Sequence, residues 1–499
     1  SAQPRGRERG AMALLCLLSI WAAPDDTAAP FAARPHYVDS VYRGHVEETL
    51  KSYSHHMSDT TKTRENLEKM LTVGSAFWVD SASKIASLDP QAVTLDSVLS
   101  AADQANPKQL VVAVIHNLPN RGCHSSVAPG EICCRYAPDG TCAYTAMDAT
   151  CTDGLDHYKG KFIDALAAAL KRHAAVPVAL VVEPESLANL ATSTAEGKCA
   201  EPATQAAYVE GVRYALEAIA RAAPHAALYL DAGHGGQLGT NPAVNKFVEI
   251  VSSLGAAVQT LRGFATNVAR YRPLGIPCPA TAFEAGSLEL TPVPTFCKAN
   301  RGHDCCADGC QSQSWRATAS SGNNEHNFVQ LLAARMRDSP FLRARLPSPH
   351  FIIDTSRNGN ADASPTECDK WCNLHGAGVG LVPASRPQLP DLIDSYFWIK
   401  RPGESDGCTP TLPDGSKCPT FDQKCAEDGS IGFHEGEVFA PHAGELFVTH
   451  LIELACRARL NDHQSSHAMA TPSDSCTSTA MAVAADAQTS ETKSPPVTP

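Results

Sequence analysis

The sequence predicts an α/β fold, in which parallel strands form either a barrel or a doubly wound sheet surrounded by helices. Two observations predict this fold. Short apolar runs of strand length end abruptly on polar residues, and segments with helical spacing separate these runs along most of the chain. Strands and helices that alternate in this way are typical of parallel sheets. Such folds keep their catalytic residues at the carboxyl ends of the strands, so the polar residues there are the first candidates for function.

Five apolar runs have the length and composition of buried strands. The most informative run spans 178–182 and stops at Glu183-Pro184-Glu185, where two carboxylates follow the apolar residues directly. The other runs are at 110–117, 227–230, 351–353 and 396–399. Each of them also leads into a polar loop. Because carboxyl ends of parallel strands meet at one edge of a sheet, we expect these loops to lie together.

Segments with helical patterns separate the strands. The first spans 158–173, with Phe162, Leu166 and Leu170 four residues apart on one face. The others are at 205–222, 242–254, 325–337 and 443–459. Parallel strands need long crossover connections, and helices usually supply them. The helical segments therefore support the same fold class as the strands.

Six loop sequences resemble, in order, those of the family 6 glycoside hydrolases, which are inverting cellobiohydrolases and endoglucanases that cut β-1,4-glucans. The matching segments are Glu-Pro-Glu-Ser-Leu-Ala-Asn-Leu at 183–190, Tyr-Leu-Asp-Ala-Gly-His at 229–234, Gly-Phe-Ala-Thr-Asn-Val at 263–268, Asp-Thr-Ser-Arg-Asn-Gly at 354–359, Trp-Cys-Asn-Leu-His-Gly-Ala-Gly at 371–378 and Gly-Glu-Ser-Asp-Gly at 403–407. The resemblance implies a distorted, TIM-like parallel β/α barrel of about seven strands, with the active site in a cleft or tunnel at the carboxyl ends of the strands.

Composition divides the chain into four parts. Residues 1–23 carry a short apolar segment preceded by arginines, which is typical of a signal peptide with an upstream extension; a buried amphipathic helix is the alternative. We expect an N-terminal extension at 24–64 and a family 6-like catalytic domain with cysteine-rich insertions at 65–460. The tail at 461–499 is rich in Ala, Ser, Thr and Pro, so we expect it to be disordered or O-glycosylated.

Charge and hydropathy argue against several partners. A net charge of −12 disfavours nucleic acids and anionic membranes, because neither is attracted to an acidic surface. No segment after the first residues is long and apolar enough to span a bilayer. A neutral polysaccharide or oligosaccharide is indifferent to this charge. We therefore expect an extracellular monomer that acts on such a substrate and needs no cofactor.

Nineteen cysteines indicate an oxidising compartment, and removal of Cys16 with the signal peptide would leave an even number for disulfides. The family resemblance implies two of the pairs, which are Cys123 with Cys199 and Cys372 with Cys425. A metal site is the alternative for one histidine and three cysteines at 303–310. Zinc sites prefer separated cysteine pairs, so we expect disulfides there and no metal.

Inverting hydrolysis of a glycoside needs an acid that protonates the leaving oxygen and a carboxylate that activates water on the opposite face of the sugar. The resemblance puts Glu185 at the general-acid position, where the family has Asp, and Asp406 at the position of the base. The extra methylene of glutamate moves the carboxyl group by about 1 Å, which costs rate unless the backbone compensates. For Asp406, an ordinary loop acid in a Gly-rich turn is the alternative.

One loop departs from the family pattern at the expected active site. The family has Arg-Asp-Cys where this chain has Arg-Gly-Cys at 121–123, so Gly122 replaces the Asp that normally keeps the acid protonated. The nearby tyrosine and serine of the family align with His116 and Ala128. A proton relay through His116 is one replacement for the missing Asp. A carboxylate folding back from the following insertion is another, and the candidates are Asp148, Asp153 and Asp156.

The resemblance also implies sugar-binding side chains. Trp78 and Trp371 match aromatic platforms, where the flat face of a pyranose stacks on an indole ring. The polar residues at sugar-binding positions are Asp80, His234, Asn267, Lys400 and Glu404. Gln237 and Thr240 replace tryptophans on the leaving-group side, which predicts a weaker grip there. Residues with supporting roles are Asp231, Arg357 and His116; a structural ion pair or helix cap is the alternative for the first two.

Two functions are compatible with these residues. The first is a secreted glycoside hydrolase that cleaves β-1,4-glucan, in cellulose or a related polysaccharide, with Glu185 as acid and Asp406 as base. The second is a catalytically impaired glucan-binding or cell-wall-organising protein, which the loss of the carboxylate at Gly122 favours. A purely structural cysteine-rich protein would leave the motifs at the strand ends unexplained.

Overall fold

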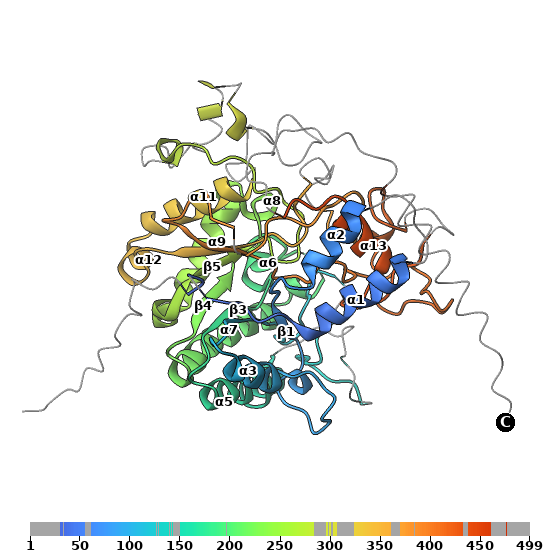
Figure 1. Cartoon of the computed structure of the whole chain (residues 1–499). Helices are drawn as coiled ribbons and strands as arrows, with labels where there is room; N and C mark the ends of the chain where they lie inside the picture. The colour runs from blue at the N-terminus through green and yellow to red at the C-terminus, as the bar shows by residue number, and fades with distance from the viewer. Residues whose placement is uncertain are drawn as a thin grey trace, which may run out of the picture.

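The computed structural model describes residues 30–460 and Cys476, apart from 33, 55–60, 126, 128, 139, 141, 143–149, 196, 284–295, 298, 301–302, 307–323, 361–369, 384 and 433–437. The expected signal peptide at 1–23 and the tail at 461–499, except Cys476, lie outside the described residues. Ala128 and Asp148 lie outside them too. Figure 1 shows the course of the chain from the N-terminal helices to the C-terminal ones.

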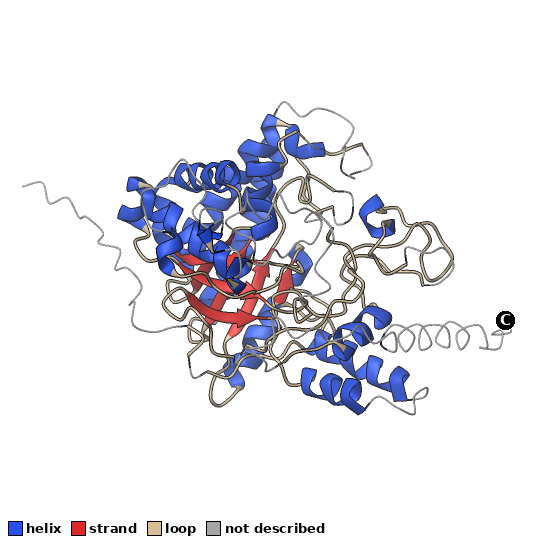
Figure 2. Cartoon of the chain, turned by 90° about the horizontal axis from the view of Figure 1, so that it is seen from above, coloured by secondary structure: helices blue, strands red, loops and turns tan. Residues whose placement is uncertain are grey.

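Parallel strands form one seven-stranded sheet, in the order in which they occur in the chain. The strands are β1 Phe77–Val79, β2 Val111–Ile115, β3 Val178–Val182, β4 Ala227–Asp231, β5 Leu261–Thr266, β6 His350–Asp354 and β7 Ile393–Phe397. Every adjacent pair is parallel. One parallel bridge joins Ser75 to Trp398, next to the two edge strands. The sheet therefore curls toward closure, which confirms the predicted distorted parallel barrel (Figure 2).

Side chains of each strand alternate between the inside of the barrel and the helices around it. In β3, Ala179 and Val181 belong to the inner cluster, whereas Leu180 and Val182 pack against the helices. All residues of β3 are buried, which explains why this strand is a continuous apolar run in the sequence. Other inner side chains come from the remaining strands and from the start of the described chain: Phe31, Val112, Val114, Tyr229, Ala265, Ile352 and Phe397.

Helices cover the outer face of the sheet (Figure 2). The larger ones are α3 Leu95–Gln104, α5 Asp164–Arg172, α7 Pro202–Ala222, α9 Asn241–Ser253 and α11 Glu325–Asp338. Shorter helices are α4 Thr152–His157, α6 Ser186–Thr192, α8 Gly235–Leu238 and α12 Pro340–Arg345. The helix predicted at 158–173 begins with a π-helical stretch at Tyr158–Ile163. The predicted helix at 205–222 begins earlier, at Pro202, because proline fits the first turn of a helix.

Three further helices pack together beside the edge of the sheet. They are α1 Ser40–Ser54, α2 Thr61–Met70 and α13 Val448–Cys456. Both N-terminal helices contact α13 although they are far from it in the chain (Figure 1). Their shared core includes Tyr42, Leu67, Trp398 and Leu451. The patterns in the sequence did not predict α1 or α2, and the structure shows that they pack against the barrel.

The last helix is shorter than predicted, because the residues before it bond to the loop that follows β7. The prediction began this helix at residue 443, and α13 begins at Val448. The Ser405 N–H donates to the Glu445 carbonyl oxygen over 2.9 Å, and the Phe447 N–H donates to the Gly403 carbonyl oxygen over 2.8 Å. These bonds hold the loop that contains Asp406.

Disulfides connect many of the loops around the barrel. The described pairs are Cys123–Cys199, Cys133–Cys142, Cys134–Cys151, Cys278–Cys305, Cys297–Cys306, Cys372–Cys425, Cys408–Cys418 and Cys456–Cys476. Within the described part of the chain, two groups of side chains have the spacing of metal ligands. One consists of Cys278, Cys297, Cys305 and Cys306, and the other of Cys408, Cys418 and His442. All of these cysteines are disulfide-bonded. These cysteines offer no thiolate to a metal. No helix of the same part is long and apolar enough to cross a membrane.

Candidate active site

A pocket lies at the carboxyl ends of the strands. The predicted site residues that line it are Trp78, Asp80, His116, Glu185, Trp371, Lys400 and Asp406. The predicted site residues outside its lining are Asp231, His234, Asn267, Arg357 and Glu404. Sequence reasoning missed His124 and Arg270, which line the pocket and face Glu185. The pocket thus combines two candidate catalytic carboxylates, two tryptophans and several basic side chains.

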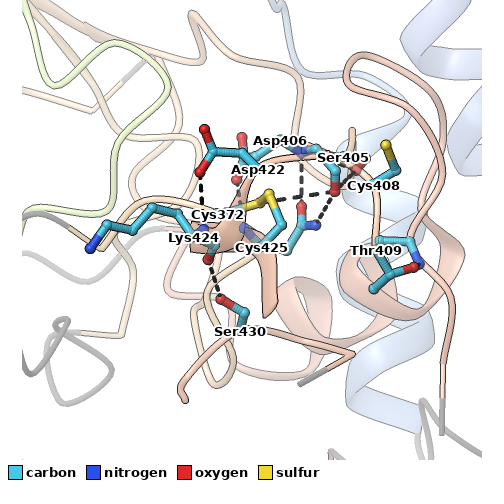
Figure 3. Close-up of a disulfide and its surroundings, with 12 residues drawn as sticks. Cys372, Ser405, Asp406, Cys408, Thr409, Asp422, Lys424, Cys425 and Ser430 are labelled. Atoms are coloured by element: carbon cyan, nitrogen blue, oxygen red, sulfur yellow. Dashed lines mark hydrogen bonds between the residues drawn. A yellow bond between two sulfur atoms is a disulfide. The ribbon is translucent and has the colours of Figure 1, made fainter. Parts of the chain in front are cut away.

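Asn373 and a neighbouring disulfide hold the backbone around Asp406. The Asn373 N–H donates to Asp406 Oδ2 over 2.9 Å, and the Asp406 N–H donates to Asn373 Oδ1 over 2.8 Å. Cys372, which precedes Asn373, is bonded to Cys425, and Figure 3 shows this disulfide beside Ser405 and Asp406. The disulfide therefore fixes the segment that orients Asp406.

A buried cation and a buried phenol hold the carboxylate of Asp406. Arg357 Nη1 lies 2.6 Å from Asp406 Oδ1, and the Tyr271 hydroxyl donates to Asp406 Oδ2 over 2.7 Å. The Arg357 guanidinium also lies 4.1 Å from the centre of the Tyr271 ring. Burial alone would raise the pKa of Asp406, but the charges of Arg357 and Lys400 and the hydrogen bonds lower it below its ordinary value. Asp406 is therefore an ionised carboxylate at neutral pH.

Glu185 occupies a turn directly after β3. It has φ 64°, the left-handed region that is uncommon for residues other than glycine, and α6 begins at the next residue. The Glu185 N–H donates to Asp231 Oδ1 over 2.7 Å, which holds this turn. The carboxylate forms an ion pair with Arg270 through Oε1, and His124 Nε2 lies 3.7 Å from Oε2. The turn thus presents the Glu185 carboxylate to two basic side chains of the pocket.

Asp231 supports Glu185 from the end of β4. Its Oδ1 accepts the N–H groups of Glu185 and of Gly233, at 2.7 and 2.9 Å. Burial raises the pKa of Asp231 to about 7, although these two hydrogen bonds lower it. Asp231 does not line the pocket, and it contacts Glu185 through the backbone.

Glu183 connects the loop after β2 to the end of β3. Its carboxylate accepts the backbone N–H groups of Asn117 at 3.1 Å and Leu118 at 3.3 Å, and the Tyr158 hydroxyl at 2.8 Å. Burial raises the pKa of Glu183 to about 7, against the lowering effect of these bonds. The loop that continues to Gly122 is anchored in this way. These contacts give Glu183 a structural role in the fold.

Trp78 lies among polar neighbours at the end of β1. Its indole Nε1–H donates to the Ile399 carbonyl oxygen over 2.7 Å, and Lys400 Nζ lies 5.6 Å from the centre of its ring. Lys400 also pairs with Glu404 at 3.0 Å, and Glu404 pairs with Arg401 at 2.8 Å. Burial would raise the pKa of Glu404, but the two cations lower it to about 2. This ion-pair network fixes Lys400 at the wall of the pocket.

Three predicted residues have environments that the sequence did not indicate. The Asn267 amide bonds to the backbone of Arg272 and Asp354, at 3.0 and 2.8 Å, so it holds a turn. His234 is buried, and burial together with nearby arginines keeps its pKa well below the ordinary value. The His116 ring packs edge-on against Trp78 with 5.7 Å between ring centres, and burial lowers its pKa as well.

The loop around Gly122 carries a histidine in place of the missing carboxylate. Gly122 itself has φ 66°, a left-handed conformation. Asp153 and Asp156, two of the predicted replacements, are exposed on α4 and do not line the pocket. His124, two residues after Gly122, faces Glu185 instead. Its nearness to the altered motif was the only signal for it in the sequence.

A curled parallel barrel with carboxylates and tryptophans around a pocket at its carboxyl edge has the architecture of an O-glycosyl hydrolase, and comparison with known proteins shows that this protein is one. The sequence model of the glycosyl hydrolases family 6 matches residues 31–288 and 307–458. The chain therefore belongs to glycosyl hydrolase family 6, and the resemblance seen in the sequence is confirmed.

Fungal enzymes are among the similar proteins. The 1,4-beta-D-glucan cellobiohydrolase C of Emericella nidulans is 30% identical over 85% of this chain and 77% of its own length. The catalytic core domain of a cellobiohydrolase from Chaetomium thermophilum superimposes with a TM-score of 0.63 at 25% identity, over 87% of this chain and 99% of that domain. A cellobiohydrolase from Humicola insolens in complex with glucose and cellotetraose gives a TM-score of 0.62 at 25% identity, over 86% and 99%.

Proposed function

We propose that the protein cleaves β-1,4-glucan, in cellulose or a related polysaccharide, with inversion, and that Glu185 is the acid and Asp406 the base. One observation carries this proposal: two carboxylates in contrasting environments line one pocket. The Asp406 side chain is 6% exposed and held by a buried arginine, whereas the Glu185 side chain is 25% exposed. Inverting hydrolysis needs two carboxyl groups in one site, one that stays ionised and one that exchanges a proton.

The proposed roles follow from these environments. Asp406, kept ionised by Arg357, accepts a proton from the attacking water or from a water chain leading to it. Glu185 donates its proton to the oxygen of the leaving sugar. Trp78 and Trp371 offer apolar ring faces for stacking against pyranose rings, and Asp80 completes the polar wall near Trp78.

The substrate class rests on the relatives, because the similar proteins are named as 1,4-beta-D-glucan cellobiohydrolases. Extracellular action is supported by the many disulfides, which persist in oxidising compartments. We also propose that the protein acts as a monomer. Glu185, Asp406, Trp78 and Trp371 of one chain line the same pocket, which supports this proposal.

The test is hydrolysis of soluble cello-oligosaccharides by the purified protein, with the anomer of the fresh product recorded by NMR. Glu185→Gln is the control, because it removes the proton donor with little change in volume. Product of inverted configuration that disappears in Glu185→Gln supports the proposal. Binding of the same sugars without any product would favour a glucan-binding protein instead.

A further inference from the structure

Three side chains form a hydrogen-bonded row that ends at Glu185. The Gln237 Nε2–H donates to Asn189 Oδ1 over 3.0 Å, and Asn189 Nδ2 lies 2.9 Å from His124 Nδ1. At the other side of the imidazole, His124 Nε2 lies 3.7 Å from Glu185 Oε2. We propose that His124 is a positioning residue whose Nε2–H holds Glu185 Oε2 while Glu185 transfers its proton from Oε1. This inference rests on the proposed role of Glu185 as the acid.

The row determines which ring nitrogen of His124 carries a proton. Gln237 donates to the oxygen of the Asn189 amide, so the NH2 group of this amide is the side that faces His124. An NH2 group only donates hydrogen bonds, so Nδ1 accepts and the ring proton is on Nε2. The row therefore directs an N–H group at the carboxyl group of Glu185.

Each member of the row has a fixed position. His124 follows Cys123, which is bonded to another loop through a disulfide. Asn189 is buried in α6. Gln237 in α8 packs against Gly233, where a Cβ atom would lie 2.4 Å from Gln237 Oε1. A row held at both ends can keep His124 in one orientation, which a positioning role requires.

The position of the row explains two departures from the family pattern together. Gln237 occupies the position of a family tryptophan on the leaving-group side. Gly122 occupies the position of the family Asp, and His124 lies two residues further along the chain. Gln237 supplies the outer end of the row. The loss of the Asp at Gly122 makes another group necessary beside the acid. We infer that the chain has exchanged a carboxylate neighbour of the acid for a hydrogen-bond donor.

Donation to Oε2 specifies how Glu185 transfers its proton. Once the substrate has displaced Arg270 from Oε1, the proton resides on Oε1. The O–H bond breaks as the proton moves to the glycosidic oxygen, which leaves with the electron pair of the broken C–O bond. The attacking water forms the new C–O bond and gives its proton to Asp406. The carboxylate that remains is stabilised by the N–H group of His124. The present distance of 3.7 Å is longer than a hydrogen bond, and contacts of this kind commonly shorten in the substrate complex.

The first test compares two substrates, cellotetraose and β-cellobiosyl fluoride. The fluoride ion leaves with little help from an acid, whereas the sugar that leaves from cellotetraose needs a proton. We expect His124→Ala to lower kcat for cellotetraose by about tenfold or more, with KM nearly unchanged, and to affect the fluoride much less. His124→Gln, which keeps an N–H donor, should recover part of the loss. His225→Ala, at an exposed histidine on the opposite edge of the barrel, is the matched control.

Equal losses on both substrates, or no loss on either, would overturn the role of His124 while leaving the proposed function intact. A wild-type protein that cleaves neither substrate would instead contradict the proposed function. Nitrogen NMR of histidine-labelled protein gives a second readout that does not depend on activity. The His124 signals are the ones present in the wild-type spectrum and missing from that of His124→Gln. They should show a protonated Nε2 and an unprotonated Nδ1, and the reverse tautomer would contradict the proposal.

Discussion

Arg270 forms an ion pair with Glu185 through the oxygen that faces away from His124. The same guanidinium lies 5.5 Å from the centre of the Trp371 ring. One side chain thus contacts both the proposed acid and a proposed sugar platform. A sugar that stacks on Trp371 and offers its glycosidic oxygen to Glu185 must displace this guanidinium. Arg270 therefore competes with the substrate for both groups.

We predict that Arg270→Gln raises kcat/KM for cello-oligosaccharides. The contacts that the substrate must replace are worth about 1 kcal/mol, which corresponds to a gain of roughly fivefold. Initial rates at substrate concentrations well below KM measure this ratio directly. Arg337→Gln, at an exposed arginine of α11, serves as the control. A large loss of activity in Arg270→Gln would show that this residue binds the substrate or the transition state.

Gly122→Asp tests whether a carboxylate in this loop can replace His124. Because Gly122 has φ 66°, an Asp costs about 1 kcal/mol of backbone strain, which the fold tolerates. We expect little change of kcat in the wild-type background and a partial recovery of kcat in the His124→Ala background. Gly122→Ala in both backgrounds controls for the backbone effect. A rise in the wild type alone would mean that the loop still lacks a necessary group.

Arg357→Lys should shift the acid limb of the pH–rate profile to higher pH. Burial raises the pKa of Asp406 and Arg357 is the main group that lowers it, so a less well placed cation lets this pKa rise. Asp406, the proposed base, is then protonated over a wider range of low pH, and kcat/KM falls there first. The measurement is kcat/KM from pH 3 to pH 8, with thermal unfolding to confirm the fold. An unchanged acid limb would exclude Asp406 as the titrating base.

Five of the seven strands and the Asp406 loop could be predicted because their signals are local, whereas β1, with only three residues, was missed. β3 is buried on both faces and reads as a run of apolar residues, and the motif at 403–407 contains Asp406. β5 contains Arg262 and Gly263, so the pattern alone did not reveal it. The N-terminal helices are mostly polar, and they bury their apolar residues against each other and against α13 and Trp398, which lie in distant parts of the chain.

The missed site residues depend on loop geometry. Arg270 reaches Glu185 because the preceding turn includes Asn267 and Ala269, which have φ 61° and 57°. An alanine with positive φ is not expected from local preference and is imposed by tertiary contacts: the Ala269 N–H donates to Asp354 Oδ2 over 3.0 Å. Apart from the three aspartates of the insertion, sequence reasoning assigned roles only at positions where the family has functional residues. A new basic residue beside such a position was therefore overlooked.

We predict that the folded protein is most stable in mildly acidic solution. Burial raises the pKa of Glu183, Asp231 and Glu325 to about 7, whereas unfolded carboxylates titrate near pH 4. Between about pH 4 and pH 7 these three carboxyl groups are ionised in the unfolded chain and protonated in the folded protein. Their contribution to the free energy of unfolding therefore falls as pH rises from about 4 to 7. Hydrogen bonds and cations hold the pKa of Glu404 and Asp394 near 2 despite burial, so their contribution is lost as pH falls from about 4 to 2.

Together these opposite slopes predict a maximum of stability near pH 4 to 5, roughly where unfolded carboxylates titrate. Thermal unfolding followed from pH 2 to pH 8 measures this curve. Asp394→Asn removes one of the groups with a lowered pKa, so the variant should lose less stability than the wild type on acidification. A midpoint temperature that rises steadily up to pH 7 would contradict the raised pKa values of Glu183, Asp231 and Glu325.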